Sequence, residues 1–302
     1  MLAKNRDLTL RKLTLTASLA AVYTIFRAIP ISTLIGTSGR ITAAGMAAPL
    51  IGFLLEPSYG IAAVFVGTII ASLFPWNPIK FYGLDFIPGA LNVTLVSLVV
   101  RGRRMEAALM LLVTIGLFII NPYTRLFVGS SLLSPPIPYL WMHLVALFVL
   151  ISPLSKDIAA KIGADQLKAA KIMATWSWRN IKTWPRITRW LITQNGRPAG
   201  AIAVLAFAGT MIEHVSGGIL YATVVGSNAV ALWSSIFLVY PIERIVLVAG
   251  AILICTPVLR FLRVSARGRA PESSNGQFTG TARQLDERRA KTSRFFDANS
   301  TS

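Results

Sequence analysis

Repeated apolar stretches, separated by short polar or proline-containing breaks, constrain the fold of this chain more than any other feature. About 20 apolar residues cross the hydrocarbon core of a bilayer, and fewer suffice where the bilayer is locally thin. The pattern therefore predicts an all-α, polytopic bundle of transmembrane helices. Because the gain or loss of one helical hairpin would leave the sides of the loops unchanged, we expect six to eight spans. The eight stretches cover residues 13–31, 41–55, 59–74, 86–100, 105–120, 138–151, 199–225 and 229–262.

The breaks between these stretches contain residues that end helices. Glu56-Pro57 separates the second stretch from the third, and proline cannot continue a helix. The basic residues 101–104 end the fourth stretch, and Asn121-Pro122 ends the fifth. The first stretch is too long for the apolar region of a signal peptide, so we expect it to remain as an uncleaved helix.

The net charge of +18 is explained by topology better than by nucleic-acid binding. The basic residues lie in short segments between the apolar stretches, whereas a nucleic-acid binder collects them on one face of a folded domain. Lys and Arg accumulate in loops that stay in the cytoplasm. Eight crossings that start inside leave only Arg40, Lys80, Arg125 and little else outside. We therefore expect a multi-pass protein of the cell membrane with both termini in the cytoplasm.

The same pattern divides the chain into four parts. Residues 1–152 form N-terminal transmembrane helices, and residues 198–265 form a C-terminal helix pair. Residues 153–197 are basic and rich in Trp, with an apolar face at helical spacing, which is typical of a helix lying on anionic lipid headgroups. A solvated linker helix of this kind is favoured over one that docks on a cytoplasmic partner. The polar residues 266–302 are expected to form a disordered cytoplasmic tail.

Catalytic and metal-binding motifs are missing from the sequence. His143 and His214 are the only histidines and Cys255 is the only cysteine, so a multi-histidine or cysteine-based metal site is excluded. No motif of a metalloprotease, an α/β-hydrolase or a P-loop ATPase occurs. We predict that the chain is not an enzyme and holds no cofactor. His143 follows Trp141 near the outer end of a predicted helix, where an interfacial residue is expected.

Charged residues in the last two predicted spans are the strongest indication of function. Burying an ionisable group at membrane depth costs about 3 kcal/mol on insertion scales, so such residues pair or line a wet cavity. Glu213 and His214 lie near the middle of the seventh span, and Glu243 and Arg244 near the middle of the eighth. A purely structural Glu213–Arg244 ion pair and a role in holding a polar substrate are both open at this point. The residues predicted to bind substrate are Arg40, Asn77, Asp85, Asn92, Glu213, His214, Tyr240, Glu243 and Arg244.

Two further features have structural and functional interpretations. Aromatic residues precede the fourth span on the outer side, namely Trp76, Phe81 and Tyr82, and such residues are either interface anchors or contacts for a flat ligand. In the first span, Ala17 and Ala21 bring two small residues onto one helix face, which lets another helix approach closely. That second helix could belong to this chain or to a partner.

Several motifs together resemble the substrate-binding S component of energy-coupling factor (ECF) type vitamin transporters. They are the first helix with Ala17 and Ala21, the run from Ile41 to Gly60, the run from Gly83 to Ala90, the run from Gly209 to His214, and Tyr240-Pro241-Ile242-Glu243-Arg244. These motifs cover about half of the chain. The family is held together by its fold more than by strict signatures.

The resemblance implies a six-helix membrane protein that binds a vitamin in an outward-facing pocket. Ala17 and Ala21 would contact a transmembrane T component driven by two ATPase subunits, and the loop 30–40 would be a lid over the pocket. No hydrolysis would occur in this chain. Residues 105–151 and the basic segment after them would be an insertion relative to the family. A non-catalytic structural subunit of a membrane complex is the alternative function, and an enzyme acting on a lipid is a distant third.

Overall fold

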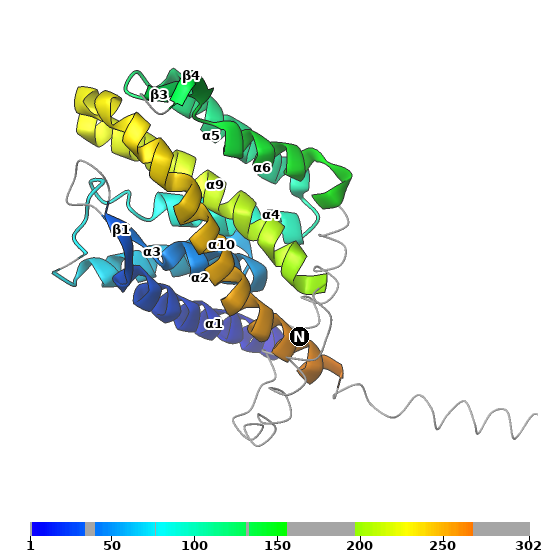
Figure 1. Cartoon of the computed structure of the whole chain (residues 1–302). Helices are drawn as coiled ribbons and strands as arrows, with labels where there is room; N and C mark the ends of the chain where they lie inside the picture. The colour runs from blue at the N-terminus through cyan, green and yellow to red at the C-terminus, as the bar shows by residue number, and fades with distance from the viewer. Residues whose placement is uncertain (1, 34–39, 76, 131–132, 156–196, 268–302) are drawn as a thin grey trace, which may run out of the picture. The chain divides into compact units, whose positions relative to one another are not determined.

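A computed structural model of the chain describes residues 2–33, 40–75, 77–130, 133–155 and 197–267. These residues are mostly helical, with eight α-helices and two short β-hairpins (Figure 1). Each helix lies at one of the eight apolar stretches, so the predicted helical class is confirmed. The basic segment 153–197 and the tail 266–302 lie almost entirely outside the described residues. The helices are α1 (Leu2–Ala28), α2 (Ala44–Leu54), α3 (Pro57–Ser72), α4 (Ile87–Val100), α5 (Arg104–Ile120), α6 (Trp141–Ile151), α9 (Arg197–Val225) and α10 (Ala229–Arg267).

The predicted breaks set the helix ends. α2 ends at Leu54, shortly before the predicted break at Glu56-Pro57. Pro57 is the first residue of α3, a position where its missing N–H costs nothing. α4 stops at Arg101, and Gly102 then takes a positive φ of 80° before α5 begins. α1 ends ahead of Pro30, which removes a backbone donor and disfavours helical geometry at Ile29.

Two β-hairpins occur that the sequence did not predict, in the loops and at the ends of the neighbouring predicted spans. β1 (Pro30–Thr33) pairs antiparallel with β2 (Arg40–Thr42), so the predicted lid segment is a β-hairpin at its base, and residues 34–39 lie outside the described residues. β3 (Phe127–Ser130) pairs with β4 (Leu133–Pro138) between α5 and α6. The second strand of each hairpin takes up residues assigned to an apolar span, so α2 begins at Ala44 and α6 at Trp141.

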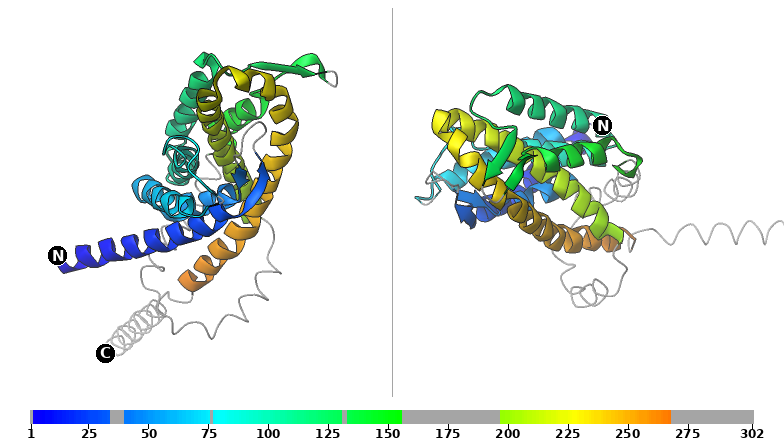
Figure 2. Two further views of the ribbon diagram at one scale, coloured as in Figure 1. Left: turned by 90° about the vertical axis from the view of Figure 1, so that its left-hand side faces the viewer. Right: turned by 45° about the horizontal axis from the view of Figure 1, so that its top comes forward.

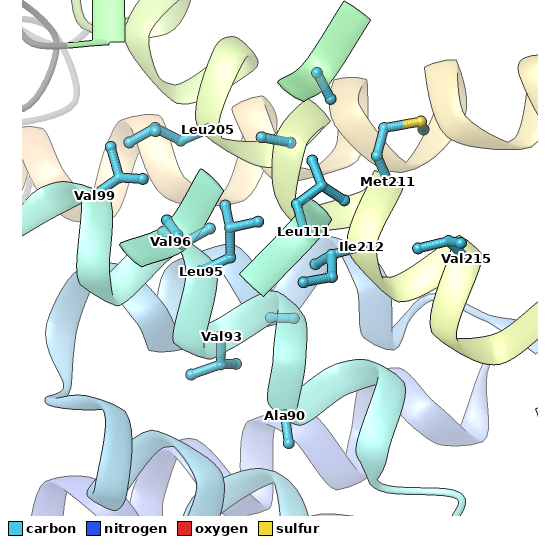
Figure 3. Close-up of a cluster of buried hydrophobic side chains, with 14 of the residues drawn as sticks. Ala90, Val93, Leu95, Val96, Val99, Leu111, Leu205, Met211, Ile212 and Val215 are labelled. Atoms are coloured by element: carbon cyan, nitrogen blue, oxygen red, sulfur yellow. The ribbon is translucent and has the colours of Figure 1, made fainter. Parts of the chain in front are cut away.

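The helices of residues 1–263 pack as one compact unit in which α4 and α9 form the middle layer. α5 and α6 lie on one side of this layer and α1, α2 and α3 on the other, as two further views show (Figure 2). Fully buried apolar side chains of the two middle helices pack against each other and against α5 (Figure 3). The middle helices contribute Val93, Val96, Val99, Leu205, Met211 and Ile212, and α5 contributes Leu111.

The loops of this unit fall into two groups, at opposite ends of α4. At its C-terminal end, Lys12 Nζ donates to Glu56 Oε1 over 2.8 Å, and Arg104 Nη1 donates to the carbonyl oxygen of Ser152 over 2.5 Å. At the other end, Asn121 of the α5 end bonds Thr223 of α9, and Trp233 Nε1 donates to the carbonyl oxygen of Tyr123. Each of these contacts joins segments that the sequence had predicted on the same side of a membrane.

Apolar side chains also face outward. α5 buries Leu111, Ile115 and Phe118, yet Leu109, Leu112, Val113 and Leu117 on its other face are each about half exposed. Of the described residues, one helical stretch, Ala199–Phe261, is long and apolar enough to cross a membrane, and 28% of its most apolar part is buried. The core helix of a soluble protein can pass the same test of length and composition, but it would be mostly buried. The shorter apolar helices are α2, α3, α4 and α6.

Candidate functional site

Buried and partly buried polar side chains inside the unit 1–263 form a network of hydrogen bonds and electrostatic interactions. They come from α1, β1, α4, α9 and α10, with a further group from α6. Polar groups removed from water are normally hydrogen-bonded, so each unpartnered atom among them indicates a place where something else can bind. The network has three regions, centred on Glu213, on Arg244 and on the two histidines.

Glu213 projects from α9 towards α2 and α4. Asn92 Nδ2 donates to Glu213 Oε2 over 2.6 Å. Two glycines make this approach possible, because a Cβ added at Gly45 would lie 3.2 Å from Glu213 Oε2, and one added at Gly209 would clash with Asn92 Oδ1. Glu213 is partly buried as a residue, in the middle of a helix that other helices contact on several sides.

Arg244 lies on α10 beside Glu243, and both are buried. Arg244 Nη2 is 3.7 Å from Glu243 Oε2, and Arg244 Nη1 donates to the carbonyl oxygen of Thr210 over 3.4 Å. The Ser32 hydroxyl of β1 donates to Glu243 Oε1, so the predicted lid hairpin contacts this pair. Arg244 Nε has no hydrogen-bond partner among the described residues.

The Glu213–Arg244 ion pair, one of the two interpretations that the sequence left open, does not form. Arg244 interacts electrostatically with Glu213 but pairs with its own neighbour, Glu243. The reason is geometric, because α9 packs on α4 and the carboxylate of Glu213 bonds Asn92 there.

His143 and His214 form a continuous polar and aromatic stack with two tyrosines. His143 Nε2 lies 3.1 Å from His214 Nδ1, and Tyr139 Oη lies 3.4 Å from His214 Nε2. The Tyr240 ring stacks on His214 with a centroid distance of 4.6 Å, and its hydroxyl donates to the carbonyl oxygen of Tyr139. The expectation of an interfacial His143 is wrong, because its side chain is fully buried. α6 is shorter than predicted, and the β3–β4 hairpin covers its first turn.

Asp85 and Asn77 stabilise the loop between α3 and α4. Asp85 accepts hydrogen bonds from the backbone N–H groups of Lys80 and Phe81, and its Oδ1 lies 3.6 Å from Arg27 Nη2. Asn77 Nδ2 donates to the carbonyl oxygen of Ala71 over 3.4 Å. Burial lowers the pKa of Lys80, and Arg27 and Arg40 lower it further against the opposing effect of Asp85.

The structure thus brings together six of the nine residues predicted to bind substrate, namely Asn92, Glu213, His214, Tyr240, Glu243 and Arg244. Asp85 is linked to them only through Arg27, which interacts electrostatically with Glu213. Asn77 bonds only within the loop between α3 and α4 among the described residues. Arg40 is exposed on β2, where its carbonyl oxygen accepts a hydrogen bond from Lys80 Nζ. Trp76 lies outside the described residues.

Sequence reasoning missed several members of the network. Arg27 lies inside the first predicted span, so the rule that singled out Glu213 could have found it. Tyr23, one helical turn earlier, is buried and lies beside Arg27 and Thr68. No sequence signal pointed to Ser32 or Tyr139, because an isolated hydroxyl in a predicted loop is common.

Ala17 and Ala21 are both exposed on α1. The neighbouring Leu19, Ala20 and Tyr23 are buried against the rest of the unit. The face with the two alanines is therefore not used for helix packing within the described part of the chain. It is free for another helix.

In comparisons with protein-family models, with curated proteins and with solved structures, none matches this chain.

Proposed function

We propose that the chain is an integral-membrane solute-binding subunit, similar to an S component, of an uptake transporter for a vitamin or another micronutrient. Separate ATPase subunits and a transmembrane T component would drive transport, and this chain would bind the solute without chemical conversion. The observation that carries the proposal is Glu213: a largely buried acid in the middle of α9, with one carboxylate oxygen bonded to Asn92 and no ion pair among the described residues.

The outward apolar faces support the membrane location. A soluble protein rarely exposes contiguous apolar surface on several helices, whereas lipid solvates such surface. Leu253 of α10 is 75% exposed and Phe148 of α6 is 74% exposed, and α3 and α5 each carry several exposed aliphatic residues. Lipid is the solvent that suits all four helices at once.

The loop contacts support a bundle of six to eight spans with both termini in the cytoplasm. The end of the unit with Lys12, Arg101 and Arg104 would face the cytoplasm, in agreement with the excess of basic residues there. Two helices limit the number of spans, since α2 and α6 have 11 residues each and reach only about 16 Å at about 1.5 Å per residue. Each would cross only in a thinned bilayer or as part of a hairpin.

The order of elements supports the S-component resemblance. Apart from the α5–α6 hairpin, the described α-helices are six, namely α1, α2, α3, α4, α9 and α10. α2 and α4 contribute residues close to Glu213 of α9, and the β1–β2 hairpin contacts Glu243 as a lid would. The α5–α6 hairpin is the additional element. The exposed Ala17 and Ala21 are available for a T component.

Unpartnered polar atoms support a polar solute. Arg244 Nε and Arg27 Nε are both buried without a hydrogen bond among the described residues, and leaving such donors unpaired costs about 1 to 3 kcal/mol each. A ligand that offers acceptors at this depth would recover that free energy. Solute binding therefore explains why the network is incomplete.

Mass spectrometry of small molecules that copurify with the protein in mild detergent tests the proposal. We expect one polar solute at near-stoichiometric amount in the wild type and its loss in Glu213→Gln. Glu106→Gln is the matched control, because Glu106 is exposed, pairs with Arg103 and loses the same charge. Absence of any solute from the wild type, together with no thermal stabilisation by a mixture of vitamins, would contradict the proposal.

A non-catalytic structural subunit is the alternative, and the histidine region favours it. His143, His214, Tyr139 and Tyr240 contact one another, and His143 Nδ1 is the ring nitrogen that they leave without a partner among the described residues. If Glu213→Gln changes stability but leaves copurified molecules unchanged, the structural function is preferred.

A further inference from the structure

The buried carboxylates of the network differ in how their charge is balanced. Asp85 lies 3.6 Å from Arg27, and Glu243 lies 3.7 Å from Arg244. Glu213 has only the amide of Asn92, and the described residues provide it with no ion pair. Three acids therefore share two arginines, and Glu213 is the acid left over.

The groups around Glu213 come from every neighbouring element. Asn92 of α4 bonds one oxygen, Gly45 of α2 lies close to the same oxygen, and Leu247 of α10 packs against Gly45. Arg244 and Arg27 act on Glu213 only electrostatically, and both arginines already have a nearer acid. The second carboxylate oxygen, Oε1, makes no hydrogen bond among the described residues.

We propose that the solute carries a positively charged nitrogen group whose N–H donates to Glu213. This inference rests on the proposed function and specifies the chemistry of its ligand. An unpaired charge in a medium of low polarity is costly, and a cation with N–H donors supplies both the missing charge and the missing hydrogen bond. A neutral or anionic solute would leave the excess negative charge in place.

An organic cation suits the site better than a metal ion. Metal ions of the Ca²⁺ type need six or more oxygen ligands, and Mg²⁺ needs an octahedral set. The described residues contain no group of three or more acidic, histidine or cysteine side chains that could hold a metal. The remaining oxygen of the Asn92 amide lies against Gly209, so it points away from any ion at Glu213 Oε1.

Three small molecules of nearly the same shape test the charge of the ligand. Benzamidine is a planar cation, benzamide is its neutral analogue and benzoate is the anion. Thermal unfolding of the full chain in detergent, after dialysis to remove copurified solute, is followed with each probe up to millimolar concentration at constant ionic strength. We expect dose-dependent stabilisation by benzamidine. Benzamide and benzoate should give at most a tenth of its apparent affinity.

Two variants show whether Glu213 is responsible. Glu213→Gln keeps an acceptor for Asn92 but removes the charge. It should lower the affinity for benzamidine by about 10-fold to 100-fold. Glu106→Gln should leave benzamidine binding unchanged, because Glu106 lies in the exposed first turn of α5 and pairs with Arg103. Benzamidine binding that survives Glu213→Gln overturns the inference.

The same experiment separates this inference from the proposed function. If a solute copurifies but is neutral or anionic, or if benzoate binds more tightly than benzamidine, the chain binds solutes and the charge assignment is wrong. If neither a copurified solute nor any probe binds, both ideas fail. If sodium or potassium chloride stabilises the chain through Glu213 while benzamidine does not, the site takes an inorganic cation and the inference is overturned.

Discussion

The Glu213 region and the histidine region are both buried and polar, yet they differ in how completely their groups satisfy one another. In the histidine region, Tyr139, His214 and His143 form one chain of contacts that Phe118 and Trp233 cover, and His143 Nδ1 is the ring nitrogen left without a hydrogen bond among the described residues. In the Glu213 region, one carboxylate oxygen, Asn92 Oδ1 and Arg244 Nε remain without partners among the described residues. Unpartnered buried polar groups are costly, and a ligand can supply the missing partners. We therefore expect substitutions in the two regions to have separable effects on stability and binding.

The largest effect is expected from Trp233→Ala in the histidine region. Trp233 is 1% exposed, packs edge-on against Tyr139 and Phe118, and donates its Nε1–H to the carbonyl oxygen of Tyr123 over 2.8 Å. Truncation leaves a cavity and should lower the free energy of unfolding by about 3 to 5 kcal/mol. Denaturant unfolding in detergent measures the loss. The residual folded protein should still bind solute with wild-type affinity.

His143→Phe should destabilise the protein less. The ring volume is kept, but His214 Nδ1 loses its only neighbour at 3.1 Å, which costs about 1 to 3 kcal/mol. Thermal unfolding of the variant beside wild type reports this loss. A drop in solute affinity of more than tenfold, with the melting temperature unchanged, would show that His143 contributes to solute binding and not to stability.

Gly45→Ala should affect binding more than stability. The added methyl group would lie 3.2 Å from Glu213 Oε2 and 3.1 Å from Leu247 Cδ1, so the carboxylate must shift by a few tenths of an ångström. We expect about a tenfold loss of affinity, equivalent to about 1.4 kcal/mol, with a smaller change in unfolding free energy. Gly116→Ala on α5 is the control, because an added Cβ there meets nothing. Equal binding by both variants would argue against a ligand at Glu213.

Lys12→Met should have the smallest effect. Lys12 and Glu56 are about half exposed, and surface ion pairs contribute about 0 to 1 kcal/mol. Neither unfolding nor binding should change by more than this. A large loss of T-component-dependent uptake with normal binding would instead assign this end of α1 to the partner surface.

The sequence predicted the helices well because their limits are local. Pro57, Gly102 and Pro122 interrupt helical geometry whatever the rest of the chain does. The β-hairpins could not be predicted in this way. Ser38-Gly39 indicates a turn before residues 40–42, but strands of three to six residues are too short for a pattern that separates a strand from a loop.

Most residues of the site were predicted from the sequence, but the interactions between them were not. Glu213, Glu243 and Arg244 were recognisable because charge is rare at the centre of an apolar stretch. Their partners depend on which helices pack together. Because α9 packs on α4, Glu213 accepts a hydrogen bond from Asn92. His143 comes from α6, on the other side of α9, and no spacing in the sequence connects it with His214.

Chemical labelling of single cysteines tests the central claim most directly. Cys255 is the only native cysteine and is buried, so a Cys255→Ser chain gives a clean background. Glu213→Cys, Leu205→Cys and Gly102→Cys are treated with a membrane-impermeant maleimide on intact cells. We expect labelling of position 213 from outside, no labelling of the fully buried position 205, and labelling of position 102 only after the cells are permeabilised. Labelling of position 102 on intact cells, or a position 213 that stays unreactive from outside, would contradict it.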